Sequence, residues 1–209
     1  MKHHDVRNRL IERTITVIAE NGLDKTTTKS IVKGTDINEV YIYRHFATKE
    51  DLLVAAFEML DTELVGRMMQ QAKVMHIKHL AYELRCRIFF EAVWKYLLGS
   101  KEECLAFIRY YYSPYFIKYS AETHRQRYQP LLDRISPVFK EEANIWMILS
   151  HILNVMLNFA VKVHIGHMPD SDDCAEHVFR VIYASVKQYF REEDGPGEHQ
   201  PLRMCAESI

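Results

Sequence analysis

The chain has 209 residues, 48% apolar and 26% charged, which is the composition of an ordinary globular protein with a sizeable core. Seven glycines and six prolines are too few for the many turns of an all-β chain, so the composition favours helices. The net charge of −1 gives no overall electrostatic signature of nucleic-acid binding, and a surface of that kind must therefore be local.

The cysteines and the N-terminus indicate a cytoplasmic protein. Cys86, Cys104, Cys174 and Cys205 are scattered and form no CxxC pair, which argues against a disulfide framework or a zinc site and suits a reducing compartment. The segment MKHHDVRNRL is charged and is not followed by the apolar run of a signal peptide. We therefore expect a cytoplasmic protein without a cofactor.

The first predicted helix is followed by a sharp stop. Apolar residues recur at helical spacing between residues 10 and 18, and this helix ends at the sequence ENGLD. Gly22 suits the left-handed position that stops a helix, and Leu23 suits the apolar contact that often follows it. Any of the three threonines 26–28 can cap a second, short helix that turns Ile31 inward.

A tight turn then leads into a third helix and a fourth. Asp36 tolerates a left-handed turn conformation, and Asn38 suits the cap of a short helix over residues 39–46. Thr48 and Asp51 have the spacing of a capping box, which predicts the start of a long helix. Two short helices joined by a tight turn form a helix-turn-helix arrangement.

The third helix has two different faces. Ile42 and Phe46 lie one turn apart and can pack inward, whereas Val40, Tyr41 and Arg44 project to the other side. The major groove of DNA admits a helix, and an arginine can donate two hydrogen bonds to a guanine edge. Periodicity alone leaves a second interpretation open, in which the outer face packs on the rest of the chain.

Local charge favours DNA modestly. Residues 1–50 hold nine Lys/Arg and seven Asp/Glu, which leaves +2 there and −3 in the remainder. Side chains, backbone amides and the positive end of a helix dipole can all contact a duplex. The residues that we expect to bind double-stranded DNA are Thr27, Thr28, Lys29, Asn38, Glu39, Val40, Tyr41, Tyr43, Arg44, His45 and Lys49.

The N-terminal part resembles the tetracycline-repressor (TetR) family of transcriptional regulators. The family pattern is a Gly-apolar helix stop, a Thr-led second helix, a turn, a Tyr-x-x-Phe recognition helix and a Ser/Thr-Lys-Glu-Asp-Leu-Leu segment. The corresponding residues are Gly22-Leu23, Thr27-Thr28, Asp36-Ile37, Tyr43 with Phe46, and Thr48 to Leu53. The resemblance implies an all-α protein, with a helix-turn-helix DNA-binding domain at 1–50 and a helical effector-binding and dimerisation domain at 51–191. A tail at 192–209 lacks apolar periodicity and is expected to be mobile.

The sequence departs from the family in its reading helix. Asp36 stands where the turn usually has Gly, Val40 where Gly or Ala is usual, and Tyr41 where a small Ser or Thr is usual. Glu39 adds an acid close to DNA, which either contacts a cytosine amino group or favours its own helix N-terminus. The operator sequence therefore cannot be taken from any relative.

The larger part is predicted to be helical at about 77–98, 102–112, 121–136, 141–165 and 173–191. The stretch 145–165 is interrupted by polar residues and is expected to be too polar to span a bilayer and to be buried on most sides. Aromatic residues here can be plain core, but crowded tyrosine hydroxyls need partners and suit a cavity for a flat, mostly apolar effector. The expected pocket residues are Phe90, Trp94, Phe107, Tyr110, Tyr111, Tyr115, Phe116, Tyr119, Trp146 and Phe159.

The last two long helices are apolar on more than one face and are candidates for a homodimer interface. An isologous dimer presents two recognition helices to the two half-sites of a near-palindromic operator. The residues expected at this interface are Ile152, Met156, Val163, Val178, Ile182 and Tyr189.

The tract 164–177 is rich in His, Asp and Cys, but its spacing matches no zinc pattern, and a polar loop with a helix cap at Ser171 or Asp172 explains it without a metal. His151 is read as a hydrogen-bonded core residue. The chain has no GxSxG, phosphate-binding glycine loop, HExxH or telling Cys/His pair, so we do not expect an enzyme. We expect a repressor released from DNA by a small, largely apolar or aromatic effector. The alternative is a helical dimer controlled by a protein partner or a metal.

Overall fold

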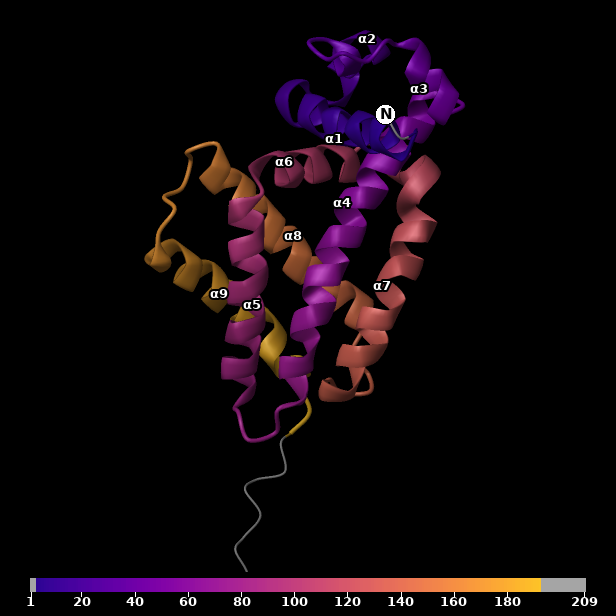
Figure 1. Ribbon diagram of the computed structural model, residues 1–209. Coiled ribbons are helices and arrows are strands. Elements are labelled where there is room, and N and C mark those ends of the chain that lie inside the picture. Colours follow the sequence, from indigo (N-terminus) through magenta and orange to yellow (C-terminus); the bar gives the residue numbers. More distant parts are fainter. Residues whose placement is uncertain (1–2, 193–209) are drawn as a thin grey trace, which may run out of the picture.

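The computed structural model describes residues 3–192 and forms an all-α fold, as predicted. Figure 1 shows a small head, made by the first three helices, above an elongated helical body. In the described residues the α-helices are α1 (His3–Asn21), α2 (Thr28–Val32), α3 (Val40–His45), α4 (Lys49–Gln71), α5 (Tyr82–Gly99), α6 (Lys101–Tyr111), α7 (Ala121–Ile135), α8 (Ile145–His164) and α9 (Asp172–Val186). Short 3-10 turns η1 (Leu23–Lys25), η2 (Ala72–His76), η4 (Ser136–Val138) and η5 (Lys187–Tyr189) and a π-helical turn η3 (Phe116–Ser120) connect them.

The head is built by the caps and the apolar spacing that the sequence predicted. The Thr27 hydroxyl accepts from the backbone amide of Ser30 and caps α2. Thr48 and Asp51 form the predicted reciprocal capping box at the start of α4. Ile42 and Phe46 are buried against the core of the head, so the inner face of α3 lies where its spacing placed it.

The turn between α2 and α3 differs from the prediction. No non-glycine residue among those described has a positive φ, so the expectation of a left-handed Asp36 was wrong. Gly34, two residues earlier, takes the positive φ of 76° that the turn needs, a value that costs glycine little. The carboxylate of Asp36 instead pairs with the guanidinium of Arg9 on α1, which lowers the pKa of Asp36. Gly22 does have a positive φ of 80°, but its ψ of 166° is extended rather than left-handed helical.

Helix α4 runs from the head down through the body, as Figure 1 shows. It packs against α1 above and against α5, α6 and α7 below, and therefore belongs to both parts of the molecule. Arg109 on α6 makes a second connection, because its guanidinium donates to the carbonyl oxygens of Ile18 and Ala19 on α1, each at 2.7 Å. These carbonyls lie near the C-terminus of α1, where the helix dipole favours a cation.

The helices of the body begin and end close to their predicted positions, with three shifts, one of which is that α9 ends at Val186, before the turn η5, rather than near 191. Helix α5 begins at Tyr82 rather than near 77, because the preceding residues form η2 and a turn, and α8 begins at Ile145, where the Asn144 side chain caps it. After α9 the chain crosses the body and pairs with the segment after α7. The Lys140 amide donates to Tyr189 at 2.8 Å, and the Arg191 amide donates to Val138 at 3.1 Å.

Helix α8 is less enclosed than predicted. On length and composition alone its 20 residues could cross a membrane, so the expectation that this stretch is too polar was wrong by that criterion. Only 33% of its apolar window is buried, although α8 packs against α5, α6 and α9. The other apolar residues of α8 are half-buried against the core, and the residues that it exposes are Met147, His151, Asn158 and Lys162.

The predicted tail, apart from Glu192, lies outside the described residues, and so does Cys205. Cys86, Cys104 and Cys174 are free thiols. Burial raises the pKa of both Cys86 and Cys104 to about 12.

Removing the capping box tests whether α4 begins where the structure places it. Thr48→Ala deletes the oxygen that accepts from Asp51, and we expect the free energy of unfolding to fall by about 1 kcal/mol. The matched control is Thr62→Ala, an exposed threonine inside the same helix, which should change stability by less than about 0.5 kcal/mol. Urea titration followed by circular dichroism measures both, and equal effects would contradict the assignment.

Candidate functional site

The outer face of α3 is open to solvent. Val40 and Tyr43 are each 57% exposed and Tyr41 is 37% exposed, whereas Ile42 between them is fully buried. Aromatic and β-branched side chains are usually kept from water, so three exposed on six residues of helix need a reason. Within residues 3–192 the body does not cover this face, and it is available to a partner.

Two contacts order the polar groups of this face. The Arg44 guanidinium lies over the Tyr41 ring, 4.8 Å from its centroid, so part of its rotamer freedom is already lost. The Glu39 carboxylate accepts a hydrogen bond from the Thr28 hydroxyl on α2. This bond ties α2 to α3, and the two roles foreseen for Glu39 stay predictions.

The remaining residues expected to bind DNA lie around the same face. Asn38 accepts from the Val40 amide at 3.0 Å and holds the start of α3. Lys29 is exposed, and His45 and Lys49 are half-buried. The Thr27 amide donates to the Ser30 hydroxyl at 2.8 Å.

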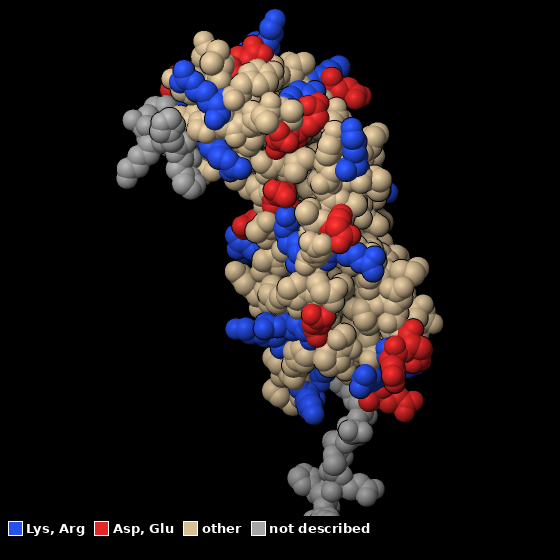
Figure 2. All heavy atoms as spheres, turned by 90° about the vertical axis from the view of Figure 1, so that its right-hand side faces the viewer, with Lys and Arg blue, Asp and Glu red and all other residues tan. Residues whose placement is uncertain are grey.

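The charge on the surface is mixed. On the face that Figure 2 shows, Lys and Arg side chains alternate with Asp and Glu over both head and body, and no large patch of one sign appears there. This agrees with the near-neutral net charge of the chain. DNA binding by this molecule would rest on local contacts rather than on a broad basic field.

The interior of the body is organised around His124. Five aromatic rings surround its imidazole, with ring centroids between 4.5 and 6.1 Å away. They come from α4, α6, η3, α7 and α8 and belong to Phe57, Tyr111, Phe116, Tyr128 and Trp146.

A buried carboxylate holds the imidazole in place. Asp61 on α4 has no exposed surface, and its carboxylate lies 2.9 Å from His124 Nδ1. Its second oxygen pairs with the Arg127 guanidinium, which also lies 3.6 Å from the half-buried Glu58. The charge of Asp61 is therefore balanced inside the body, as a buried charge requires.

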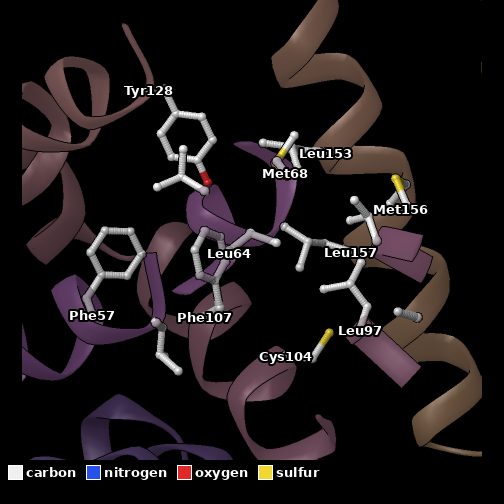
Figure 3. Packing of buried hydrophobic residues seen from close by; sticks show 14 of the residues in the cluster. Phe57, Leu64, Met68, Leu97, Cys104, Phe107, Tyr128, Leu153, Met156 and Leu157 are labelled. Atoms are coloured by element: carbon white, nitrogen blue, oxygen red, sulfur yellow. The ribbon is translucent and has the colours of Figure 1, made fainter. Parts of the chain in front are cut away.

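Tyr128, one turn after His124, is fully buried, and its hydroxyl has no hydrogen-bond partner among the described residues. Figure 3 shows its oxygen turned inward, toward Leu64 and Phe107. Burial, with the nearby Asp61 carboxylate, raises the pKa of Tyr128 well above its usual value, so the phenol keeps its proton.

Sequence reasoning missed this cluster. Asp61 falls on the apolar face of α4, four residues after Phe57 and three before Leu64, and His124 and Tyr128 share one face of α7. An acid on a buried helical face is the signal that could have revealed it.

Two small cavities share Leu149 on α8 as a lining residue. The larger, about 60 Å³, is enclosed by α5, α8 and α9 and the ends of η2 and α7, and its walls are almost entirely apolar. The smaller, about 10 Å³, is bounded by His124, Tyr128 and Trp146 and carries Ser150 and Asn154 on α8. A space of about 10–15 Å³ holds roughly one water molecule.

The ten residues predicted to line an effector pocket do not surround one cavity. Phe90 lines the apolar cavity, while Phe107, Tyr111 and Trp146 line the small one. Tyr110 donates or accepts a hydrogen bond with Ser120 at 2.9 Å inside the core. The rest line neither cavity: Trp94 stacks on Phe90, Phe116 packs on Phe57, Tyr115 stacks on the exposed Tyr119, and Phe159 is half-buried under Lys162.

Three of the residues predicted at a dimer interface lie inside the chain. Met156, Val178 and Ile182 are buried, because the sides of α8 and α9 that carry them face α5, and Ile152 lines the apolar cavity. The buried Met156, Val178 and Ile182 cannot contact a second copy in this conformation. Of the other predicted residues, Ile152 and Val163 are half-buried and Tyr189 is exposed. The apolar side chains that α8 and α9 leave outside are instead Met147, 66% exposed, and Val181, 55% exposed.

In the tract 164–177, Ser171 caps α9 by accepting from the Cys174 amide at 3.2 Å. His164 Nε2 lies 2.9 Å from the carbonyl of Leu97, and His177 contacts the Asp173 carbonyl in its own helix. Residues 3–192 contain no group of three or more His, Cys, Asp or Glu side chains that lie close enough together to hold a metal ion. His151, which was read as a core residue, is exposed and bonds to Ser185 at 2.9 Å.

Comparison with known proteins links the head to a family and the whole chain to a fold. Residues 10–56 match the family model described as bacterial regulatory proteins, tetR family. No curated protein sequence matches the chain. These residues include α2, α3 and the first turns of α4.

Solved structures resemble the chain over most of its length. A TetR family transcription regulator from Marinobacter aquaeolei VT8 has a TM-score of 0.72 at 15% identity, covering 88% of this chain and 98% of that one. One described as a putative regulator from Shewanella sp. PV-4 has a TM-score of 0.68 at 13% identity, over 86% and 96% of the two chains. FadR from Bacillus subtilis, in complex with stearoyl-CoA, has a TM-score of 0.64 at 18% identity, over 84% and 96%.

Deleting the buried carboxylate tests its place in the body. Asp61→Ala leaves Arg127 and His124 without their acid, and we expect a loss of about 3–5 kcal/mol in the free energy of unfolding. Glu58→Ala, one turn earlier on α4 and half-buried, is the matched control and should cost less than about 1 kcal/mol. Urea unfolding of the two variants decides, and a mild effect of Asp61→Ala would contradict the network.

Proposed function

Residues 10–56 belong to the tetR family of bacterial regulatory proteins, and on that premise we propose that the chain is a sequence-specific DNA-binding transcriptional regulator. The observation that carries the proposal is the outer face of α3, where Val40, Tyr41, Tyr43 and Arg44 are exposed on a helix whose inner face is fully packed. A helix whose inner face is packed on its own domain and whose outer face is exposed can enter a major groove.

The side chains of this face suit a mixed readout of bases. Arg44 carries a guanidinium that can bind a guanine edge through two hydrogen bonds. Val40 and the Tyr41 ring offer apolar contact to a thymine methyl group. The stacking of Arg44 on Tyr41 in the free protein reduces the entropy that the arginine loses on binding.

We further propose that the protein acts as a homodimer through the exposed sides of α8 and α9. Met147 and Val181 leave apolar surface exposed on these two helices. Pairing the helices of two copies buries this surface. The two copies of α3 can then address the half-sites of a near-palindromic operator.

The effector in this proposal is a small, largely apolar molecule that binds in the cavities on either side of Leu149. Apolar walls with a few polar groups at one end are typical of small-molecule sites. One structural neighbour, FadR from Bacillus subtilis, was solved with stearoyl-CoA, a molecule with a long apolar chain. The effector of this chain has to be small, or has to enlarge the cavities of about 60 and 10 Å³.

Two connections can carry the effect of such a ligand to the DNA. Asp61 joins the small cavity to α4, which leads into the head, and Arg109 joins α6 to the end of α1. A ligand that binds one arrangement of these helices better than the other shifts the equilibrium between them. We propose that the arrangement favoured by the effector does not fit both half-sites, so that the protein is a repressor released by its ligand.

Salt and a single arginine test the proposed reading of DNA. We expect the affinity for an operator, selected from a random-sequence library, to fall steeply between 50 and 200 mM salt as counterions return to the phosphates. Arg44→Ala should cost about 1–3 kcal/mol of binding and relax the base preference at one position of each half-site. Fluorescence anisotropy measures both.

The control for Arg44→Ala is Arg134→Ala, which removes the same charge from an exposed position on α7, far from the head. It should leave affinity and base preference nearly unchanged. An affinity indifferent to salt, or an equal loss in the two variants, would overturn the proposed DNA contact.

A charge placed on the proposed dimer face tests the assembly. Val181→Asp would bury a carboxylate between the two copies, and we expect it to shift the protein from dimer to monomer and to weaken operator binding by at least about tenfold. Ile117→Asp, at a position 75% exposed on η3, is the control and should stay dimeric. Sedimentation velocity gives the answer, and a Val181→Asp variant that remains dimeric would refute this interface.

A further inference from the structure

The segment after α9 closes the apolar cavity of the body. Residues 187–192, which we call the closing segment, lie at the end of the body away from the head (Figure 1). Phe190 is the only buried residue of this segment, with 6% of its surface exposed, and it is one of the walls of the apolar cavity. A single side chain of the closing segment therefore seals the cavity from this side.

The Phe190 ring stacks on two other rings at once. Its centroid lies 4.7 Å from that of Tyr82 and 4.9 Å from that of Phe139, with interplanar angles of 11° and 24°. Near-parallel stacking of this kind suits a flat aromatic ring. The Arg85 guanidinium lies over the Tyr82 ring, 4.7 Å from its centroid, and so helps to hold Tyr82 in place if Phe190 leaves.

The apolar cavity is too small for a ring as it stands. Its volume is about 60 Å³, whereas an engineered apolar cavity of about 150 Å³ binds benzene. A ligand that carries a ring therefore enters only if one wall of the cavity moves. When Phe190 leaves its position, the cavity grows by the volume of a phenyl group, because this ring is one of the walls.

The closing segment is the wall that moves most easily. Apart from Phe139, the other walls belong to η2 or to α5, α7, α8 and α9, where helical hydrogen bonds hold the backbone. The closing segment is held by two backbone hydrogen bonds to residues 138–140, at 2.8 and 3.1 Å, and by the Arg191 guanidinium, which donates to the Phe139 carbonyl at 2.6 Å. Its other residues are exposed, so its release costs little apolar burial beyond that of Phe190.

We propose that the effector carries a flat aromatic hydrocarbon ring, which takes the place of Phe190 against Tyr82 and Phe139 and displaces the closing segment. The inference rests on the proposed function, because it names the chemical class of the effector and the way in which it enters. The ligand ring regains the stacking and the apolar burial that Phe190 gives up, so the exchange costs little. A charged group would find no partner among the apolar walls.

The ligand class is tested with toluene and methylcyclohexane, which have equal numbers of carbon atoms, although only toluene has a flat ring. We expect the wild-type protein to bind toluene at least about fivefold more tightly, because stacking on two rings adds to the apolar burial. Isothermal titration calorimetry measures both affinities, and the rise in melting temperature gives an independent reading.

A crosslink that holds the closing segment in place tests the exchange. Lys140 and Tyr189 lie opposite each other beside the Phe139–Phe190 bridge, and both are exposed and line no part of the cavity. Opposite residues of an antiparallel pair are about 5.5 Å apart at Cα, within the range that a disulfide spans. In the Lys140→Cys/Tyr189→Cys variant, we expect oxidation to weaken toluene binding at least about tenfold and reduction to restore it. Wild-type protein taken through the same oxidation controls for the chain's own cysteines.

Removing the Phe190 ring distinguishes displacement of the segment from distortion of the cavity. Phe190→Ala should lower the melting temperature of the ligand-free protein by at least about 6 °C, because a buried ring is lost. It should also raise the affinity for toluene at least about tenfold, since no side chain then has to leave. When Phe190→Ala is added to the crosslinked variant, oxidation should no longer weaken binding, because the position of the ring is empty whether or not the segment is held.

Equal affinities of the oxidised and reduced crosslinked protein for toluene would overturn the exchange, and so would a crosslink that weakens binding as much without the Phe190 ring as with it. Equal binding of toluene and methylcyclohexane, or binding of neither, would overturn the ligand class. Operator binding by the wild-type protein is measured in parallel. If the operator is bound and toluene is not, only this inference fails. If the wild-type protein binds no operator at any salt concentration, the proposed function itself fails.

Discussion

A carboxylate without contact with water sits near the middle of the helix that joins the two parts of this molecule. Asp61 can be there only because Arg127 and His124 reach it from α7, and so the packing of α4 against α7 depends on polar groups as well as on apolar area. Around this network, aromatic rings from α4 itself and from α6, η3 and α8 close the body. An apolar core of similar volume could be equally stable, but it would not fix one position of His124.

In the head, the side chains proposed to read DNA lie on the exposed outer face of α3 and point away from the core. Ile42 and Phe46 hold α3 from behind, and Thr28 holds Glu39 at its N-terminal end. The exposed side chains in front are thus carried on a short helix that is fixed on two sides. A surface positioned in this way loses little order when a partner binds, which favours specific recognition.

The head could be read from the sequence because its signals are local. Capping residues, a tight turn and apolar spacing lie within a few positions of one another. The prediction failed in the head for the left-handed residues, since Gly34 and not Asp36 has the positive φ of the turn and Gly22 has an extended ψ. The interior of the body could not be read in this way. Asp61 and His124 are 63 positions apart, and no local pattern states that their helices meet. The sequence pattern shows apolar residues on more than one face of α8 and of α9, so it does not say which face is buried. Contact with α5 buries one face of each helix.

The bond between Arg109 and the end of α1 sets the geometry of any motion between head and body. One guanidinium holds two successive carbonyl oxygens, so the last turn of α1 is fixed in direction as well as in position. A shift of α6 would then tilt the head about this point instead of sliding it over the body. In a pair of such molecules, a small tilt about this point changes the spacing of the two α3 helices, because the displacement of each α3 grows with its distance from the pivot.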